Sequence, residues 1–251
     1  MKNILQGFVV AFSMYSKIPM PRINWTKENM KYCMCYFPLI GLVIGVLAYG
    51  WFRLAVWAGF GTPFRSAVLI LIPVAVTGGI HLDGLLDTAD ALSSYKSREE
   101  KLEILKDSHA GAFAIITGIC YFVLAFGIYS EMTEDKLRAL IPGFLLSRAF
   151  SALGLVSLKK AKNSGLLYTF ADAAANRRVR TVMILYIFAG TGIMAWAGGI
   201  YGWAAAGAVL LSYLWYRHMA YSKFGGITGD LAGCFLQVAE LMMALAVVLV
   251  P

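Results

Sequence analysis

Long apolar runs separated by short polar segments dominate the pattern along this chain. Seven runs are long enough to cross a bilayer as helices, because a spanning helix uses about 20 residues. They cover residues 34–58, 64–80, 110–130, 137–157, 181–199, 200–216 and 231–250. Only Gly198, Gly199 and Gly202 separate the fifth run from the sixth, so a tight turn or one re-entrant unit fits there. The pattern predicts an all-α fold: a polytopic membrane helical bundle with about seven transmembrane helices, forming a single integral membrane domain over residues 1–251.

The first 20 residues hold a shorter apolar run that Lys17, Pro19 and Pro21 bring to an end. This run lacks the small-residue cleavage pattern of a signal peptide, so we expect it to be retained. We predict that residues 1–30 form a cytoplasmic segment with a helix in the membrane interface.

Composition supports a membrane protein. Hydrophobic residues make up 59% of the chain and charged residues 14%, whereas soluble domains have about 45–50% and about 25%. The net charge of +8 is scattered between apolar runs, which argues against nucleic acid as a partner. The four cysteines lie in or beside apolar runs and do not form the two pairs of a tetrahedral zinc site.

Lys and Arg divide unevenly between the two sides of the predicted membrane. With the N-terminus inside, 17 of the 22 basic residues fall on the inner side and four on the outer side, while Arg148 lies within the fourth run. Positively charged loops stay in the cytoplasm. We therefore expect a cytoplasmic N-terminus and cytoplasmic polar loops at about 81–109, 158–180 and 217–230.

Three aspartates stand out in the segment GGIHLDGLLDTADAL. On a helix, Asp83, Asp87 and Asp90 fall within an arc of about 60°. Crowded carboxylates favour a hard divalent cation, above all Mg2+ carrying a phosphate ester. The alternative is a solvated helix face, but such faces usually mix signs, and these are the only charges between Arg65 and Lys96.

Two residues beside these aspartates are further candidates for a functional site. His81 either caps or lines the mouth of a site as a substrate-binding residue, or simply makes an interfacial hydrogen bond. Gly84 allows the close approach of a ligand or of another helix.

The segment KDSHAGAFA precedes the third run. Asp and Ser at a helix start are ordinary caps, but Lys106, Ser108 and His109 at a helix N-terminus could also bind phosphate.

The segment GGITGDLAG precedes the last run. Gly226 and Gly229 could bring the backbone close to phosphate, with Asp230 as a metal ligand or base. The alternative is a turn in which Asp230 caps the last helix.

Two charges fall inside apolar runs, where they are costly. Arg148 could pair with Glu240 or clamp a phosphate. Gln237 lies on the same predicted helix face as Glu240.

Taken together, HLDGLLDTADAL, KDSHAGAFA, SRAF, NSGLL and GGITGDLAGCFLQVAEL resemble, in order, the cobalamin synthase family of adenosylcobinamide-GDP ribazoletransferases. The opening FSMYSKIPMP is also similar, with Ser16 where the family often has Thr. The chain departs from the family pattern at Ala91, where Gly is usual, and at Lys106 and His109, where Arg is usual. None of these departures touches the three aspartates.

The resemblance implies that a ribazole hydroxyl attacks a phosphate of adenosylcobinamide-GDP and releases GMP. The acceptor is alpha-ribazole or its 5′-phosphate, and Mg2+ bridges the pyrophosphate. We assign Asp83 and Asp87 to the metal, Asp90 to the metal or the general base, and Asp230 to a second metal or the base. The resemblance also implies the cytoplasmic membrane of a bacterium or archaeon, with the site facing the cytoplasm; a homo-oligomer is compatible with it.

Other functions fit the sequence less well. A CDP-alcohol phosphotransferase needs an Ala-Arg pair soon after Gly84, and none follows. A prenyltransferase needs a second aspartate-rich motif, but Asp230 stands alone. A metal or solute transporter would explain Arg148 and Glu240, but not an acidic cluster beside basic loops.

Overall fold

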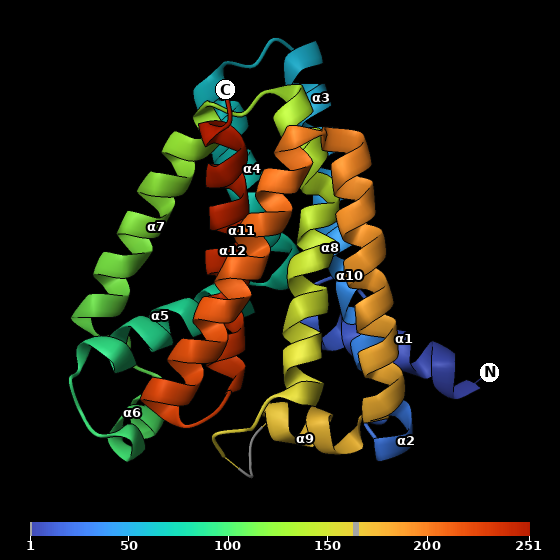
Figure 1. Ribbon diagram of the computed structural model, residues 1–251, viewed down its shortest axis with the longest axis vertical. Helices are drawn as coiled ribbons and strands as arrows, with labels where there is room; N and C mark the ends of the chain where they lie inside the picture. The colour runs from blue at the N-terminus through green and yellow to red at the C-terminus, as the bar shows by residue number, and fades with distance from the viewer. Residues whose placement is uncertain (1, 163–165) are drawn as a thin grey trace.

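The computed structural model describes residues 2–162 and 166–251, and its regular elements there are helices apart from one isolated β-bridge between Lys160 and Ile227 (Figure 1). In chain order the helices are α1 (Lys2–Tyr15), α2 (Lys27–Met30), the 3-10 turn η1 (Cys33–Cys35), α3 (Phe37–Trp57), α4 (Thr62–Thr77), α5 (Ile80–Ser93), α6 (Arg98–Ile104), α7 (Ala112–Ser130), α8 (Glu134–Ser157), α9 (Leu166–Ala173), α10 (Asn176–Gly198), α11 (Ile200–Met219), the π-helical turn η2 (Ala220–Phe224) and α12 (Gly229–Leu249). The predicted all-α membrane bundle is confirmed. The NSGLL segment begins at residues 163–165, which lie outside the described part.

Among the described helices, five are long and apolar enough to cross a membrane: α3, α7, α8, α10 and α12. A sixth span results if the bent pair α4 and α5 counts as one. The prediction of about seven spans is thus too high by this criterion, because α11, with 20 residues, is long enough but is not among the helices that are sufficiently apolar. The break between α10 and α11 is the tight turn at Gly199, below which the two helices diverge (Figure 1).

The chain bends by 96° between α4 and α5. Gly78 and Gly79 make this corner with φ angles of 66° and 80°, a left-handed backbone that side chains with a Cβ rarely adopt. Because of this corner, α5 crosses the lower end of the bundle instead of continuing the direction of α4 (Figure 1).

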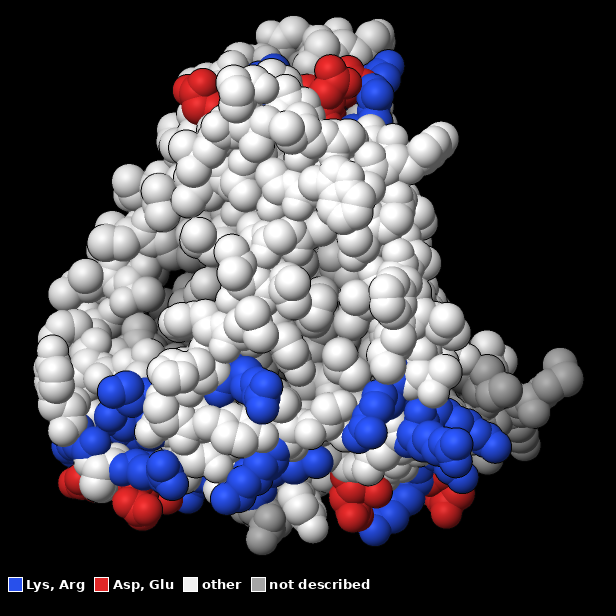
Figure 2. All heavy atoms as spheres, in the orientation of Figure 1, with Lys and Arg blue, Asp and Glu red and all other residues white. Residues whose placement is uncertain are grey.

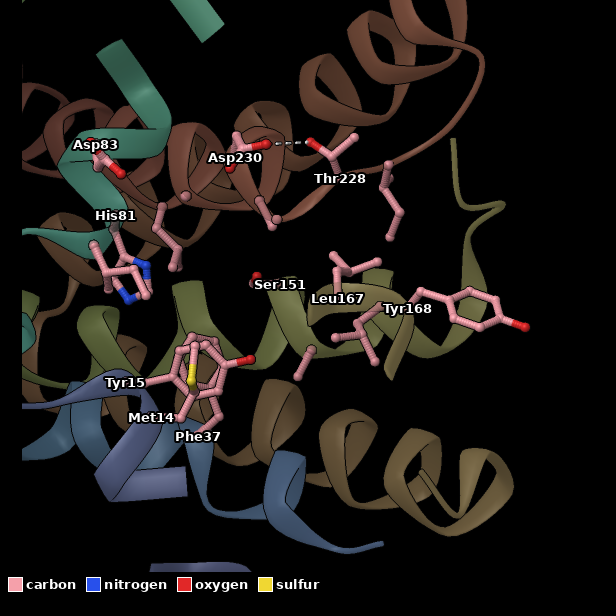
Figure 3. Close-up of a pocket in the computed structure, with 18 of the residues that line it drawn as sticks. Met14, Tyr15, Phe37, His81, Asp83, Ser151, Leu167, Tyr168, Thr228 and Asp230 are labelled. Atoms are coloured by element: carbon pink, nitrogen blue, oxygen red, sulfur yellow. Dashed lines mark hydrogen bonds between the residues drawn. The ribbon is translucent and has the colours of Figure 1, made fainter. Parts of the chain in front are cut away.

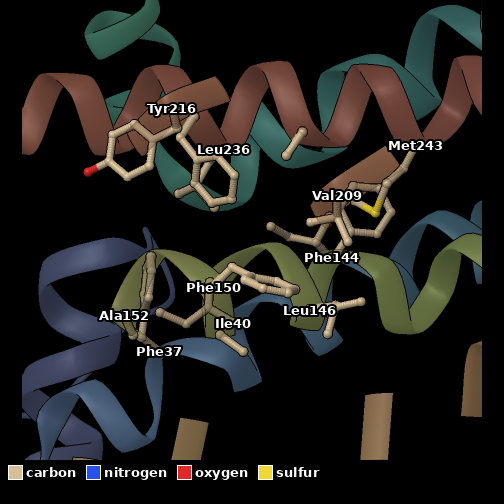
Figure 4. Packing of buried hydrophobic residues seen from close by; sticks show 14 of the residues in the cluster. Phe37, Ile40, Phe144, Leu146, Phe150, Ala152, Val209, Tyr216, Leu236 and Met243 are labelled. Carbon is tan, nitrogen blue, oxygen red and sulfur yellow. The ribbon is translucent and has the colours of Figure 1, made fainter. Parts of the chain in front are cut away.

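Helix α8 forms the centre of the bundle, and 83% of its apolar stretch of 18 residues is buried. It packs tightly against α3, where a Cβ on Gly41 would meet the Phe144 carbonyl oxygen and a Cβ on Gly45 would meet the Ile141 carbonyl oxygen. The core around this contact joins α3, α8, α11 and α12 and contains Phe37, Ile40, Phe144, Phe150, Val209, Leu236 and Met243 (Figure 4).

Charge is strongly polarised along the bundle. Most Lys and Arg side chains in view gather at the end that holds α5, α6 and α9, while the middle of this face is uncharged (Figures 1 and 2). Helix α1 lies near this basic end and its N-terminus projects sideways, in keeping with the predicted interfacial helix (Figure 1). The described residues of the three segments predicted as cytoplasmic loops lie at this end, and they contain most of α5 together with α6, α9 and η2 (Figure 1).

Candidate active site at the basic end

A cavity of about 420 Å³ lies at the basic end of the bundle, between α1, α5, α8, α9 and the start of α12. Its wall includes Met14, Tyr15, Phe37, His81, Asp83, Lys106, Ser151, Lys162, Tyr168, Thr228, Gly229, Asp230 and Leu236 (Figure 3). Segments far apart in the sequence therefore converge on one chamber.

The crossing of α5 and α12 brings two of the predicted acidic segments together. A Cβ on Gly84 would lie 2.5 Å from the Asp230 carbonyl oxygen, and a Cβ on Gly233 would lie 3.1 Å from the carbonyl oxygen of His81. The first distance is too short for a side chain and the second is very tight, so the two glycines permit the close approach of the two backbones. The close approach predicted for Gly84 is thus to a helix.

Asp83 and Asp230 both line the cavity, one on each of these helices (Figure 3). Asp230 lies in the first turn of α12, whose N-cap is Thr228, and Thr228 Oγ1 donates to Asp230 Oδ2 over 3.4 Å. Carboxylates are favoured at this end of a helix by its dipole.

Asp87 lies one turn beyond Asp83 and is half-buried. Its pKa is raised to about 6, first by burial and then by repulsion from Asp83, Asp230 and Asp90. Asp83 and Asp87 therefore both interact electrostatically with Asp230, and Asp87 also interacts with Asp90. Such a cluster is most stable with a cation beside it.

Asp90, in contrast, has both carboxylate oxygens engaged. Oδ2 accepts from the Gly111 backbone N–H at 2.6 Å, and Oδ1 accepts from the Ala114 N–H at 2.9 Å. Asp90 thus caps α7, whose own N-cap Gly111 has no side chain to do so. The helix N-terminus that we considered as a phosphate site holds this carboxylate instead.

The donor set fits magnesium as a partly hydrated, phosphate-bound ion. Among the described residues, no three Asp, Glu, His or Cys side chains come close enough to enclose a metal. Mg2+ rarely uses such a cage; it commonly takes one or two carboxylates and completes its shell with water and substrate phosphates. Asp83 and Asp87, one turn apart on α5, offer two carboxylates of this kind, and Asp230 adds negative charge close to both.

Two lysines line the same cavity, Lys106 after α6 and Lys162 before α9. Lys106 Nζ also pairs with Glu103 at 2.6 Å, and Lys162 Nζ donates to the Leu102 carbonyl at 2.6 Å. Both ammonium groups lie where they could meet an anionic substrate. The other two predicted phosphate-binding residues, Ser108 and His109, are exposed and do not line the cavity; the His109 ring is 2.8 Å from Asp107.

Gly226 and Gly229, the two glycines predicted to bring the backbone close to phosphate, have different surroundings. Gly229 lines the cavity, and a Cβ there would meet no atom within 4 Å. Gly226 is buried, and a Cβ there would lie 2.6 Å from the Lys159 carbonyl oxygen. Gly226 therefore packs against the segment before α9, and only Gly229 faces the chamber.

Arg148 and Glu240 form a buried ion pair, with Nη1 2.6 Å from Oε1 and side-chain exposures of 1% and 5%. Arg148 Nη1 also donates to the Phe144 carbonyl, and Ser147 Oγ donates to Glu240. Neither charge is among the cavity-lining residues. The geometry favours the pairing alternative over the phosphate clamp for Arg148.

Sequence reasoning missed the aromatic side of the chamber and Lys162. Met14 and Tyr15 belong to the FSMYSKIPMP opening, which signalled its importance only through the family resemblance. Phe37 is one apolar residue within a long apolar run, and nothing in the pattern distinguishes it from its neighbours.

Comparison with known proteins relates the sequence of this chain to one family. The family model described as cobalamin-5-phosphate synthase matches residues 7–248. A protein of Lachnoclostridium phytofermentans named adenosylcobinamide-GDP ribazoletransferase is 44% identical over 245 residues, covering 98% of this chain and 94% of its own. Proteins of the same name from Clostridium botulinum and Geobacillus thermodenitrificans are 32% and 29% identical, with at least 95% of each chain covered. No solved structure matches.

Proposed function

The chain belongs to the cobalamin-5-phosphate synthase family, and on this premise we propose that the chamber at the basic end carries out adenosylcobinamide-GDP ribazoletransferase activity. The observation that carries this proposal is the meeting of Asp83 and Asp230 in one cavity, beside Asp87 and two lysines. Phosphoryl transfer depends mainly on positioning and on neutralising charge, and this residue set provides both.

In the proposed reaction, a hydroxyl of alpha-ribazole or of its 5′-phosphate attacks the phosphorus that carries the cobinamide oxygen. A new phosphorus–oxygen bond forms, the bond to the GMP phosphate breaks, and GMP leaves. Asp230 lines the chamber and is the base that we propose for the hydroxyl proton. Asp90 is less suited to this role or to a metal, because both its oxygens already accept backbone hydrogen bonds.

Asp83 and Asp87 are the residues that we propose to hold Mg2+. The ion would neutralise charge on the pyrophosphate and on the leaving group. Lys106 and Lys162 would bind the remaining phosphate oxygens. Gly229 leaves room for a phosphate beside the N-terminus of α12, where backbone N–H groups attract anions.

The test is GMP release from adenosylcobinamide-GDP and ribazole by membranes that contain the protein. Asp83→Asn and Asp87→Asn should each lower turnover at least about a hundredfold at equal inserted protein, because each removes a charged ligand. Asp107→Asn is the matched control, since this exposed aspartate lies at the same end outside the cavity. Near-normal turnover in either site variant, or full activity in excess EDTA, would refute the metal assignment.

A transporter is not favoured by the structure, since the two intramembrane charges that suggested one neutralise each other away from the cavity.

We also propose that the basic end faces the cytoplasm, because positively charged segments are retained there. In a variant without the four native cysteines, Ser94→Cys should react only with a reagent on the cytoplasmic side. Glu131→Cys, in the turn between α7 and α8, should react only from outside. The reverse pattern would overturn this orientation.

A further inference from the structure

Resting on the proposed function, we propose that the apolar half of the chamber is the subsite for the aromatic base of ribazole. In this subsite the fused ring packs against Tyr15 and Phe37 and accepts a hydrogen bond from His81. The subsite would thereby set which acceptor the enzyme uses.

The chamber has two chemically different sides. Asp83 and Asp230 lie on one side, whereas Met14, Tyr15 and Phe37 lie on the opposite side (Figure 3). The separation suits a nucleoside, whose flat base can be buried in the apolar half while its ribose reaches the acidic half. A ribose hydroxyl would then lie beside the residues proposed for catalysis.

His81 lies at the boundary with an unmet hydrogen-bonding need. Its side chain is buried at 5% exposure, and among the described residues its Nε2 has no hydrogen-bond partner. The nearest aromatic rings are Tyr15, stacked at 6.3 Å, and Phe37, edge-on at 5.9 Å, which do not satisfy it. An unpaired polar group of this kind is costly. Nε2 itself is covered, but His81 lines the chamber, so a turn of its ring on binding would pair it with a ligand atom and remove the cost.

The other parts of the substrates fit this half less well. A volume of about 420 Å³ is near the lower end of the roughly 300–1,000 Å³ of small-molecule pockets, far too small for a corrin macrocycle. Guanine carries an amino group and a ring N–H that need acceptors, but the carboxylates lie on the other side. Among the described lining residues, Tyr15 and Ser151 add hydroxyl groups to this half.

The base of ribazole has the complementary chemistry. It is a benzimidazole with two methyl groups and one free ring nitrogen, an acceptor. The methyl groups and the ring faces match walls of Met14, Met34 and Leu155. A neutral imidazole has one N–H to donate, and the free ring nitrogen has one lone pair to receive it.

The hydrogen bond is tested with the wild-type protein alone. Binding to protein in nanodiscs is measured by calorimetry for ribazole and for the matching dimethylindole riboside, in which C–H replaces the free ring nitrogen. We expect ribazole to bind about tenfold more tightly, the contribution of one buried hydrogen bond. His81→Phe should bind both compounds alike. Equal affinity in the wild type would overturn the role of His81.

The location is tested by filling the chamber. Ser151→Leu adds bulk to the α8 wall and should raise the KM for ribazole about tenfold or more, with little change in the KM for adenosylcobinamide-GDP. Ser222→Leu, in η2 on a separate surface groove, is the matched control and should change neither. A rise confined to the donor would assign the chamber to the nucleotide, and no change in either KM would also overturn the subsite.

The two levels of the proposal fail differently. If the wild-type protein releases no GMP with either acceptor, the proposed function fails. If GMP is released but Ser151→Leu leaves the KM for ribazole unchanged, only the subsite fails.

Discussion

Removing one charge of the buried pair between α8 and α12 should strongly destabilise the protein. Glu240→Gln leaves the Arg148 guanidinium, 1% exposed, without its anion, while its hydrogen bond to the Phe144 carbonyl is not a charged contact and cannot replace it. Arg148→Met leaves the Glu240 carboxylate with the Ser147 hydroxyl. Breaking a buried ion pair on one side costs about 3–5 kcal/mol, while replacing both partners can be nearly neutral.

This cost predicts a large, measurable shift. At about 2–4 °C per kcal/mol for a chain of this size, each single variant should melt about 6–20 °C below the wild type. The double variant should recover most of the loss. Melting is measured by the temperature at which the detergent-solubilised protein loses its monodisperse peak in size-exclusion chromatography.

A surface pair provides the matched control. Asp135→Asn removes one charge from the exposed pair of Asp135 with Arg138, 3.6 Å apart, and should cost less than about 1 kcal/mol.

Turnover of the double variant separates the two roles considered for Arg148. If the pair is structural, the folded double variant should release GMP at close to the wild-type rate. A double variant that folds but is inactive would show that Arg148 acts on substrate. Wild-type melting temperatures in both single variants would refute the reasoning about the buried pair altogether.

Three further perturbations test the acidic end. Because the pKa of Asp87 is raised to about 6, a proton competes with the metal below that pH. The Kd for Mg2+ should therefore rise about tenfold per pH unit below about 6 and stay constant above 7. A Kd that calorimetry finds independent of pH would contradict the assignment of Asp87 to the metal. Asp90→Asn should lose one α7 cap bond and about 1 kcal/mol of stability but keep its Mg2+ affinity, whereas a drop in affinity like that of Asp83→Asn would make Asp90 a ligand. Gly84→Ala should lower turnover about a hundredfold. Its Cβ, 2.5 Å from the Asp230 carbonyl oxygen, must push α5 away from α12, and a shift of about 1 Å in an active site can cost that much. Gly127→Ala, whose Cβ meets open space, should leave turnover unchanged.

The sequence by itself determined the class of fold and the main acidic residues. Apolar runs of about 20 residues can be satisfied only as helices in a bilayer, so the membrane bundle followed from the pattern. The spacing of Asp83, Asp87 and Asp90 likewise placed them on one helix, because helical geometry is local. The activity came from the family resemblance, because the spacing of apolar and polar residues does not identify a reaction.

Only the tertiary structure decided what those residues contact. The aspartates of α5 share a helix, but Asp90 caps α7 while Asp83 faces the chamber, and this difference depends on where α7 begins in space. Arg148 could have served substrate or Glu240, and only the packing of α8 against α12 separated these alternatives. The aromatic wall of the chamber was hidden for the same reason: an apolar residue in an apolar run has no local signal, and its neighbours across the bundle determine whether it faces lipid, core or ligand.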